Sequence, residues 1–395
     1  MKFDFENNFE KNKQNKECLM DYDNSLLEFK KLENININNY EENTEEKMLE
    51  KFNLTFRERA NNYESVNNLE NPEYLENFFQ KKKYDIIQAQ SVLQKNGTTL
   101  FTSAGVQILD DYIFNEKELV SEKMFVIQPV IRTQFINEVA DGISTSFINI
   151  STEKLNPTMT EHFSSIKDWL SLLSDLGINK KDLDIFDRKG DPSWGGKKFK
   201  NNIMMFFYKG LEIGDAIYAY DISQSNRESI SFSDIGFGIE RLKWSLGNDN
   251  YFDYKYDNSL RPKVFDYCKT LALLSGSNLE PSNNNQGYRF RQFSKRLQQE
   301  FPGKVDSTKN ILMYYYDFWS KWVNLEKGPK ESLEIIEKEN ERNFNRILLD
   351  KLSEKYNDVG IDINLSTEEV LKLLKGTSVE EDYLNKLLKD IYERL

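Results

Sequence analysis

The hydrophobic and polar positions in the middle of the chain alternate in a way that predicts mixed α/β structure. Short apolar runs typical of strands lie at residues 84–87, 124–131, 145–150, 203–208 and 212–221. A further strand leads into Asp234, and a helix follows Gly238. The segment 209–211 is a short turn, so we expect the strands on either side of it to be antiparallel neighbours.

Helical spacing dominates elsewhere. It predicts helices at residues 45–60, 74–79, 160–176, 264–274, 287–300, 311–325 and 333–356, and two more within 367–395. Because strands precede a long helical stretch, we predict an α+β fold followed by an all-α domain. The expected boundaries are a helical N-terminal extension at 1–71, a mixed domain at 72–257 and a helical domain at 258–395.

Composition narrows the class of protein. The 395 residues are 38% hydrophobic, enough for more than one core, and the mean hydropathy is −0.68. The chain contains no apolar run long enough to span a bilayer, and its start does not resemble a secretory signal, so we expect a cytoplasmic protein with no membrane partner. The net charge of −12 argues against general DNA binding. A chain with this net charge can still carry a local basic surface.

The single histidine excludes several kinds of site. Histidine–cysteine zinc sites, two-histidine metalloprotease sites and most histidine-dependent nucleophiles need a histidine in a particular setting. His162 begins a helical pattern and has no cysteine or second histidine nearby, so we expect a structural role for it and no zinc. The two cysteines are too few for a disulfide framework. Any catalysis must use carboxylates, arginines and backbone groups.

The segment with the clearest chemical content is 233–242. Gly236 and Gly238 remove side chains where a strand becomes a helix, which lets a flat ligand lie close to the backbone. Arg241, on the first turn of that helix, can meet an anion. Taken alone, this is a generic Gly-X-Gly turn.

Other segments occur in an order that resembles class II aminoacyl-tRNA synthetases, in particular the archaeal branch of the alanyl-tRNA synthetase family. Gly-Phe-Gly-Ile-Glu-Arg at 236–241 resembles motif 3, Gln-Pro-Val-Ile-Arg at 128–132 resembles motif 2, and 100–105 is similar to the motif 1 region. Segments 191–196 and 209–212 are similar to the archaeal branch, and 279–283 resembles the signature of its tRNA-recognition domain. The resemblance runs from about residue 72 to about residue 355.

This resemblance implies an antiparallel catalytic sheet flanked by helices, and activation of an amino acid by ATP. It places Arg132 on the α-phosphate and Arg241 against ATP, with Gly236 and Gly238 in the same nucleotide site. Positioning and cationic clamps then do most of the catalytic work, because charge develops on the transferred phosphoryl group. Glu212 is implied near Mg²⁺, which prefers oxygen ligands; a solvated strand carboxylate is the alternative reading.

The resemblance also implies an amino-acid pocket. Asp234 matches the acidic residue that holds the α-amino group of the substrate, although it could instead cap the following turn. Gly214 and Asp215 stand where alanine enzymes carry Trp-Asn or Ala-Thr. The pocket is therefore expected to be roomier and more negative, so the substrate is alanine or a related amino acid, such as one with a second amine.

A basic helix follows Pro281-Ser282. Arg289, Arg291 and Lys295 alternate with apolar residues, which suits a helix laid against the phosphates of a tRNA acceptor stem, or equally a solvated amphipathic helix. Asn283 matches the residue that the family uses to read the minor groove of that stem.

Several features depart from the family. The motif 2 loop at 133–144 lacks arginine and histidine, Ile148 replaces a glutamate, and the editing domain with its zinc ligands is absent. Three functions therefore stay open. The first is an alanyl-type tRNA ligase without editing; the second is a paralogue that passes an activated amino acid to a small molecule or carrier protein; the third is a catalytically silent RNA-binding homologue. The sequence does not indicate the oligomeric state.

Overall fold

The structure is a computed structural model that describes residues 21–39, 63–94, 98–115, 117–118, 121–224, 229–247, 250–252 and 260–356. The helices predicted at 45–60 and 367–395 lie outside these residues. The chain divides into two compact units. The first contains residues up to 90, together with 96–130 and 147–251; the second contains 91–95, 131–146 and the residues from 252 onward.

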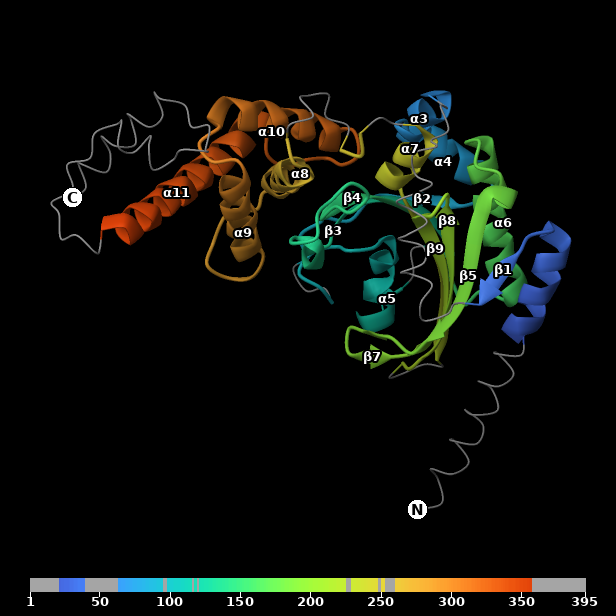
Figure 1. Cartoon of the computed structure of the whole chain (residues 1–395). Coiled ribbons are helices and arrows are strands. Elements are labelled where there is room, and N and C mark those ends of the chain that lie inside the picture. The colour runs from blue at the N-terminus through green and yellow to red at the C-terminus, as the bar shows by residue number, and fades with distance from the viewer. Residues whose placement is uncertain are drawn as a thin grey trace, which may run out of the picture. The chain divides into compact units, whose positions relative to one another are not determined.

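The first unit is built on a large sheet (Figure 1). Across the described residues its strand order is β1-β5-β8-β9-β10-β4-β3-β2. The strands are β1 (Ile37–Asn39), β2 (Asp85–Ile87), β3 (Lys123–Ile131), β4 (Ser146–Leu155), β5 (Leu183–Gly190), β8 (Lys200–Tyr208), β9 (Leu211–Ile222) and β10 (Ile230–Gly238). The central pairs from β5 to β4 are antiparallel, whereas β1–β5 and β2–β3 are parallel. The prediction of an α+β fold with a largely antiparallel sheet is confirmed.

The hairpin between β8 and β9 confirms the predicted antiparallel neighbours. Lys209 and Gly210 both have positive φ angles, 51° and 84°. Two consecutive residues of this kind form the tight turn whose twist matches that of the flanking strands. The sequence at this turn therefore fixes which strands pair.

Helices and short elements surround the sheet. They are α3 (Tyr63–Leu69), α4 (Pro72–Lys81), the 3₁₀ turn η1 (Gly105–Leu109), α5 (Asp110–Asn115), η2 (Thr133–Phe135), α6 (Met159–Asp175), η3 (Lys180–Asp182), the small hairpin β6–β7 (Ser193–Trp194 and Lys197–Lys198) and α7 (Ile239–Leu246). Helix α6 begins where Thr158 and Glu161 form a reciprocal capping box, in which each side chain accepts from the backbone of the other. No helix in the described ranges combines the length and apolarity needed to cross a bilayer.

Helix α6 covers one face of the sheet through an aromatic core. Trp169 is fully buried, stacks on Phe237 with ring centroids 4.7 Å apart, and also contacts Phe79 at 4.7 Å. Its indole Nε1 donates a 2.7 Å hydrogen bond to Thr152 Oγ1 on β4. This face therefore joins α4, α6 and the two strands β4 and β10.

The opposite face is partly covered by η1 and α5. Val106, Leu109 and Ile113 from these elements pack against strand residues in one buried cluster, which includes Leu155, Ala219 and Phe232. Strand residues two positions apart point to the same face. Asp234 therefore lies on the same side of β10 as Phe232, and the residues of the candidate site belong to this face.

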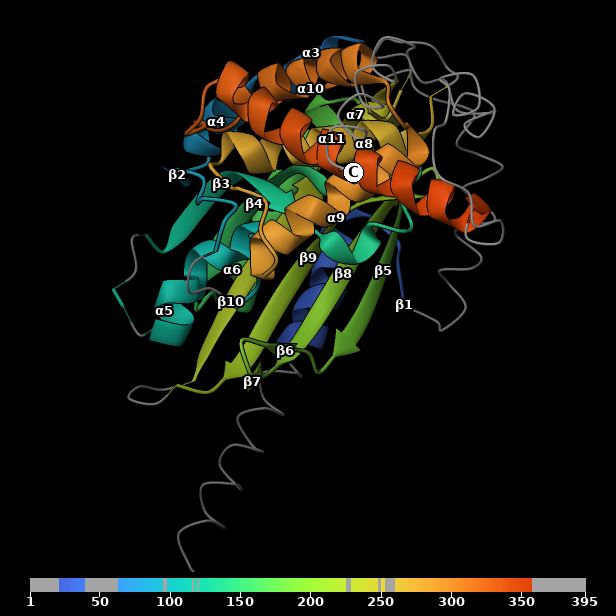
Figure 2. The same cartoon turned by 90° about the vertical axis from the view of Figure 1, so that its left-hand side faces the viewer.

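The second unit contains the predicted run of helices (Figure 2). They are α8 (Pro262–Gly276), α9 (Asn285–Glu300), α10 (Val305–Ser320) and α11 (Pro329–Tyr356). Pro262 begins α8 at the position where the missing N–H is not needed. Helix α10 ends five residues before the predicted 325, because the chain turns after Trp319, whose Nε1 donates to Lys269 O of α8 at 2.8 Å.

His162 is a core residue of the first unit. Its ring is fully buried between Tyr22, Phe163 and Tyr218, and its Nδ1 lies 2.7 Å from Ser233 Oγ. Burial lowers the pKa of His162 to about 3. The imidazole is therefore neutral in the folded protein at ordinary pH.

This buried imidazole predicts a specific acid sensitivity. Because the pKa is lowered in the folded state, the unfolded state binds the proton first, so the stability contributed above pH 6.5 is lost as the pH falls toward 3. From pH 7 to pH 5 the loss is about 2 kcal/mol. Urea unfolding should show that the unfolding free energies of the wild type and of His162→Asn differ by about 2 kcal/mol less at pH 5 than at pH 7. Parallel pH curves for the two proteins would contradict this assignment.

Candidate active site

Three carboxylic acids lie on the η1-covered face of the central strands. Asp234 on β10 is directly opposite Glu153 on β4. Two residues farther along β10, Gly236 is opposite Ser151 on β4 and Asp215 on β9. Directly opposed residues share a face, so Glu153, Asp234 and Asp215 are gathered across three neighbouring strands.

Glu153 is the most deeply buried of the three. It has no exposed surface, and its carboxyl group interacts with the side chains of Ser151 and Asp234. Burial, together with the negative charges of Asp234 and Asp215, raises the pKa of Glu153 well above its usual range. Glu153 is not among the predicted site residues, since a glutamate between Thr152 and Lys154 has the pattern of a solvated strand position.

Gly236 lies under the side chain of Asn149. A Cβ added there would lie 3.0 Å from Asn149 Nδ2. Asn149 itself accepts a 2.8 Å hydrogen bond from the Gly105 N–H, which holds the start of η1 against β4. The role of Gly236 as a position without a side chain at a ligand stays a prediction.

Gly214 is required by strand packing. A Cβ there would lie 2.4 Å from Gly236 O and 2.4 Å from the Phe237 ring, on the neighbouring strand. A backbone oxygen cannot move aside, so we expect Gly214→Ala to lower the unfolding free energy by about 2–3 kcal/mol. Gly328→Ala, where a Cβ meets nothing within 4 Å, is the matched control and should cost less than about 1 kcal/mol. Equal losses in denaturant unfolding would contradict this explanation of Gly214.

Arg241 is held at the junction of β10 and α7. Gly238, in an extended conformation, is the N-cap of α7, and Arg241 lies on its first turn. The Arg241 guanidinium donates from Nη1 to Glu212 O at 3.0 Å and lies 3.3 Å from Glu212 Oε2. Both side chains keep partial solvent exposure. The pair therefore places a cation beside a helix N-terminus, which together favour a bound anion.

Glu240 connects α7 with β4. Its carboxylate is buried and accepts from the Ile148 N–H through both oxygens, at 3.2 and 3.1 Å. Ile148 stands where the synthetase resemblance implies a glutamate. In this chain a carboxylate from α7 therefore binds the backbone at that point.

Arg132 lies in the second unit, whereas Asp234 and Arg241 lie in the first. It directly follows β3, and its N–H donates to Thr145 O at 2.7 Å, which closes the base of the loop 133–144. Helix α8 fixes this loop: Tyr267 donates to Ile136 O at 2.9 Å, and Asp266 accepts from the Thr145 N–H at 2.7 Å. Burial raises the pKa of Asp266 to about 6. A loop that lacks arginine and histidine is thus positioned by the helical unit.

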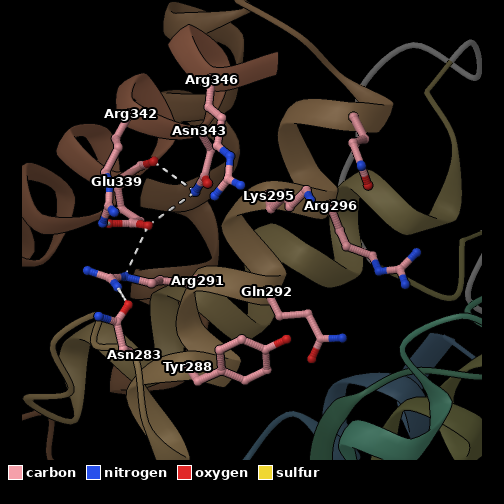
Figure 3. Close-up of a pocket in the computed structure, with 11 residues that line it drawn as sticks. Asn283, Tyr288, Arg291, Gln292, Lys295, Arg296, Glu339, Arg342, Asn343 and Arg346 are labelled. Atoms are coloured by element: carbon pink, nitrogen blue, oxygen red, sulfur yellow. Dashed lines mark hydrogen bonds and ion pairs between the residues drawn. The ribbon is translucent and has the colours of Figure 1, made fainter. Parts of the chain in front are cut away.

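A basic groove lies between α9 and α11 of the second unit (Figure 3). Its cavity of about 490 Å³ is lined by five cationic side chains and one carboxylate, namely Arg291, Lys295, Arg296, Arg342, Arg346 and Glu339. Glu339 is nearly buried; its Oε1 lies 3.5 Å from Arg291 Nε and its Oε2 lies 3.5 Å from Arg342 Nη1. One acid thus orients two guanidinium groups, and the groove keeps an excess of positive charge.

Three of the predicted tRNA-binding residues meet in this groove. Asn283, Arg291 and Lys295 line it, and the Arg291 guanidinium donates to Asn283 Oδ1. Arg289 is not among the lining residues and donates to Gln292 Oε1 at 2.7 Å. Arg342 and Arg346 were missed by the sequence analysis, because only the packing of α11 on α9 brings them to the basic helix.

Comparison with known proteins gives a distant likeness in fold. No family model matches the chain, and no curated protein matches it. Two solved structures of pyrrolysyl-tRNA synthetase from Desulfitobacterium hafniense are similar to it, each with a TM-score of 0.30 and 12% sequence identity. The alignment with the first structure covers 50% of this chain and 73% of the other chain. The alignment with the second covers 51% and 74%, respectively.

Proposed function

We propose that this protein activates an amino acid with ATP and transfers it to tRNA, as a class II synthetase of alanyl type. The observation that carries the proposal is the junction at Gly238, where Arg241 on the first turn of α7 is oriented by Glu212, on the same sheet as Asp234. An anion site and an acidic amine site on neighbouring strands are what adenylation of an amino acid requires.

The proposed reaction has two steps. The carboxylate oxygen of the amino acid attacks the α-phosphorus of ATP; a new phosphorus–oxygen bond forms, the bond to the β-phosphate breaks, and pyrophosphate leaves. A ribose hydroxyl of tRNA then attacks the acyl carbon and AMP leaves. Negative charge develops on the phosphoryl oxygens in the first step, so the Arg241 guanidinium stabilises the transition state more than the ground state.

The amine and nucleotide roles in this proposal are those that the sequence resemblance implies. Asp234 binds the α-ammonium of the substrate, and Asp215 belongs to the same face of the sheet. Gly214, predicted in this pocket, faces the opposite side, because it lies directly opposite Phe237 of the α6-covered face. Gly236 and Gly238 admit the nucleotide close to the backbone. Arg132 is the proposed ligand of the α-phosphate, in a loop fixed by α8.

Magnesium would be held largely by the nucleotide. No group of three metal-binding side chains occurs among the described residues. Glu212, the proposed ligand, offers one partly exposed carboxylate beside Arg241. This donor set fits Mg²⁺, which proteins often bind through one or two carboxylates plus substrate phosphates. The bound ion would neutralise charge on the phosphates.

The proposed acceptor is the acceptor stem of a tRNA. The groove between α9 and α11 supports this choice, because five cations and the half-exposed Tyr288 ring offer phosphate contacts and a stacking surface. Glu339 orients two of these cations, as suits a preformed binding surface. Such a groove favours RNA over a small acyl acceptor.

Pyrophosphate exchange into ATP, measured with each amino acid in turn, tests the first step. We expect exchange with alanine or a related amino acid. Charging of total tRNA with the active amino acid tests the second step. Exchange without charging would point to a small-molecule or carrier-protein acceptor, and no exchange with any amino acid would point to a catalytically silent RNA-binding protein.

A further inference from the structure

Thr145 closes the base of the loop 133–144, and both of its backbone groups form hydrogen bonds. Its carbonyl oxygen accepts from the Arg132 N–H at 2.7 Å, across the two ends of the loop. Its own N–H donates to Asp266 Oδ1 of α8, also at 2.7 Å. A single residue thus links the backbone of Arg132 to a carboxyl group on α8.

A chain of hydroxyl groups holds the side chain of Thr145. Thr145 Oγ1 donates its one hydrogen to Asp266 Oδ2 at 2.6 Å. Because a hydroxyl carries only one hydrogen, Thr270 donates to Thr145 Oγ1 at 2.8 Å, and Ser146 donates to Thr270 Oγ1 at 2.8 Å. All of these hydrogen bonds therefore point toward the carboxyl group of Asp266, which accepts from Thr145 at both oxygens.

This network is closed to solvent. Asp266, Thr145, Ser146 and Thr270 have no exposed surface, whereas Arg132 keeps partial exposure. At neutral pH Asp266 is ionised, since burial raises its pKa only to about 6. Hydrogen bonds to a carboxylate are about twice as strong as those between neutral groups. The base of the loop is therefore a dry, rigid support for a side chain that a ligand can still reach.

The proposed reaction gives this support a function. We infer that Asp266 is a positioning residue, which acts through Thr145 to hold Arg132 in place for binding the α-phosphate of ATP. This inference rests on the proposed adenylation activity, in which Arg132 is the ligand of that phosphate. Displacing a catalytic group by about 1 Å can lower a rate by about 10²-fold. A buried acid behind the loop can therefore affect the reaction without touching a substrate.

A double-mutant cycle in pyrophosphate exchange tests this role. Asp266→Ala removes both acceptors of Thr145, and we expect it to lower kcat/KM for ATP by about 100-fold in an otherwise wild-type protein. In an Arg132→Gln background, the same substitution should lower kcat/KM by less than about 3-fold, because the side chain through which it acts is already missing. An acid with a purely structural role would cause the same fold loss in both backgrounds.

Asp266→Asn serves as a second variant that keeps the shape of the side chain, in case Asp266→Ala does not fold. Its amide oxygen still accepts from the Thr145 N–H, but the charge is lost, so we expect a smaller loss in kcat/KM, of about 10-fold. This loss should also disappear in the Arg132→Gln background.

Ser275→Ala is the matched control on the same helix. It removes another buried hydrogen bond of α8, in which Ser275 Oγ donates to Ser332 O of α11 at 2.8 Å. We expect kcat/KM for ATP to be unchanged in this variant. If Ser275→Ala and Asp266→Asn lower kcat/KM alike, the effect comes from a general weakening of α8, and the inference is overturned.

The outcomes separate this inference from the proposed function. Exchange by the wild type, with equal losses for the Asp266 variants in both backgrounds, would overturn the positioning role and leave adenylation standing. No exchange with any amino acid would overturn adenylation, and calorimetric titration with ATP then measures the same cycle in Kd. A weakening of ATP binding by Asp266→Asn that disappears in the Arg132→Gln background supports the positioning role. Any other result, including no binding of ATP, refutes it.

Discussion

Replacing Arg241 by glutamine should lower kcat/KM for amino-acid-dependent pyrophosphate exchange by about 10²–10³-fold. The guanidinium is positioned before any ligand arrives, because Glu212 binds it through a backbone and a side-chain oxygen. A cation fixed in this way needs little reorganisation when charge develops on the phosphoryl group, which is why its removal affects the reaction more than the fold. The Arg241–Glu212 pair is partly exposed and should contribute no more than about 1 kcal/mol to stability.

Two further variants are the controls for Arg241→Gln. Arg261→Gln removes an exposed arginine that is paired with Glu300, and exchange should be unaffected. Arg241→Lys keeps the charge but loses the planar fork, so it should recover only part of the activity. If Arg241→Gln exchanges pyrophosphate as fast as the wild type, the nucleotide site lies elsewhere.

Replacing Trp169 by alanine should lower the unfolding free energy by about 4 kcal/mol, the largest stability effect that we expect from a single substitution. Its indole is fully buried, stacks on Phe237 and contacts Phe79. The substitution leaves a cavity between α6 and the sheet, and it also deprives Thr152 Oγ1 of its donor. Thermal and urea unfolding of the purified variant measure the change.

The control for this prediction is Leu32→Ala in the same unit. Leu32 is 74% exposed, so its truncation should change the unfolding free energy by less than about 0.5 kcal/mol. Trp169→Phe should recover part of the loss, since it restores most of the stacking area without the hydrogen bond. A loss below about 1 kcal/mol in Trp169→Ala would show that the α6 face is not the core of this unit.

Local signals in the sequence predicted much of the sheet. The turn at Lys209-Gly210 specified the β8–β9 hairpin, because its two residues adopt positive φ angles. Strand β5 was missed. Its residues Leu183–Gly190 include several charged positions, and one of them, Asp187, is buried only because Tyr22 donates to it from 165 positions away in the chain. No local pattern contains such a partner.

In the candidate site, too, local sequence predicted some residues and missed others. Motif order predicted roles for Arg241, Asp234 and Glu212, because those roles depend on the short segments around them. Glu153 was missed, because its significance comes from the register that places it opposite Asp234, about 80 residues later in the chain. Only part of the groove was predicted, for the same reason. Arg291 lies within the basic helix that the sequence predicted, whereas Arg346 comes from α11.

The burial of His162 affects how a pH–rate profile of this protein is interpreted. It is the only imidazole in the chain, and it stays neutral down to about pH 3. An inflection between pH 5 and 7 in the rate profile therefore cannot come from the usual side chain for that range. It would report a carboxyl group with a raised pKa, as burial causes at Glu153, Asp110 and Asp266. A profile repeated with Glu153→Gln would show whether Glu153 is that group.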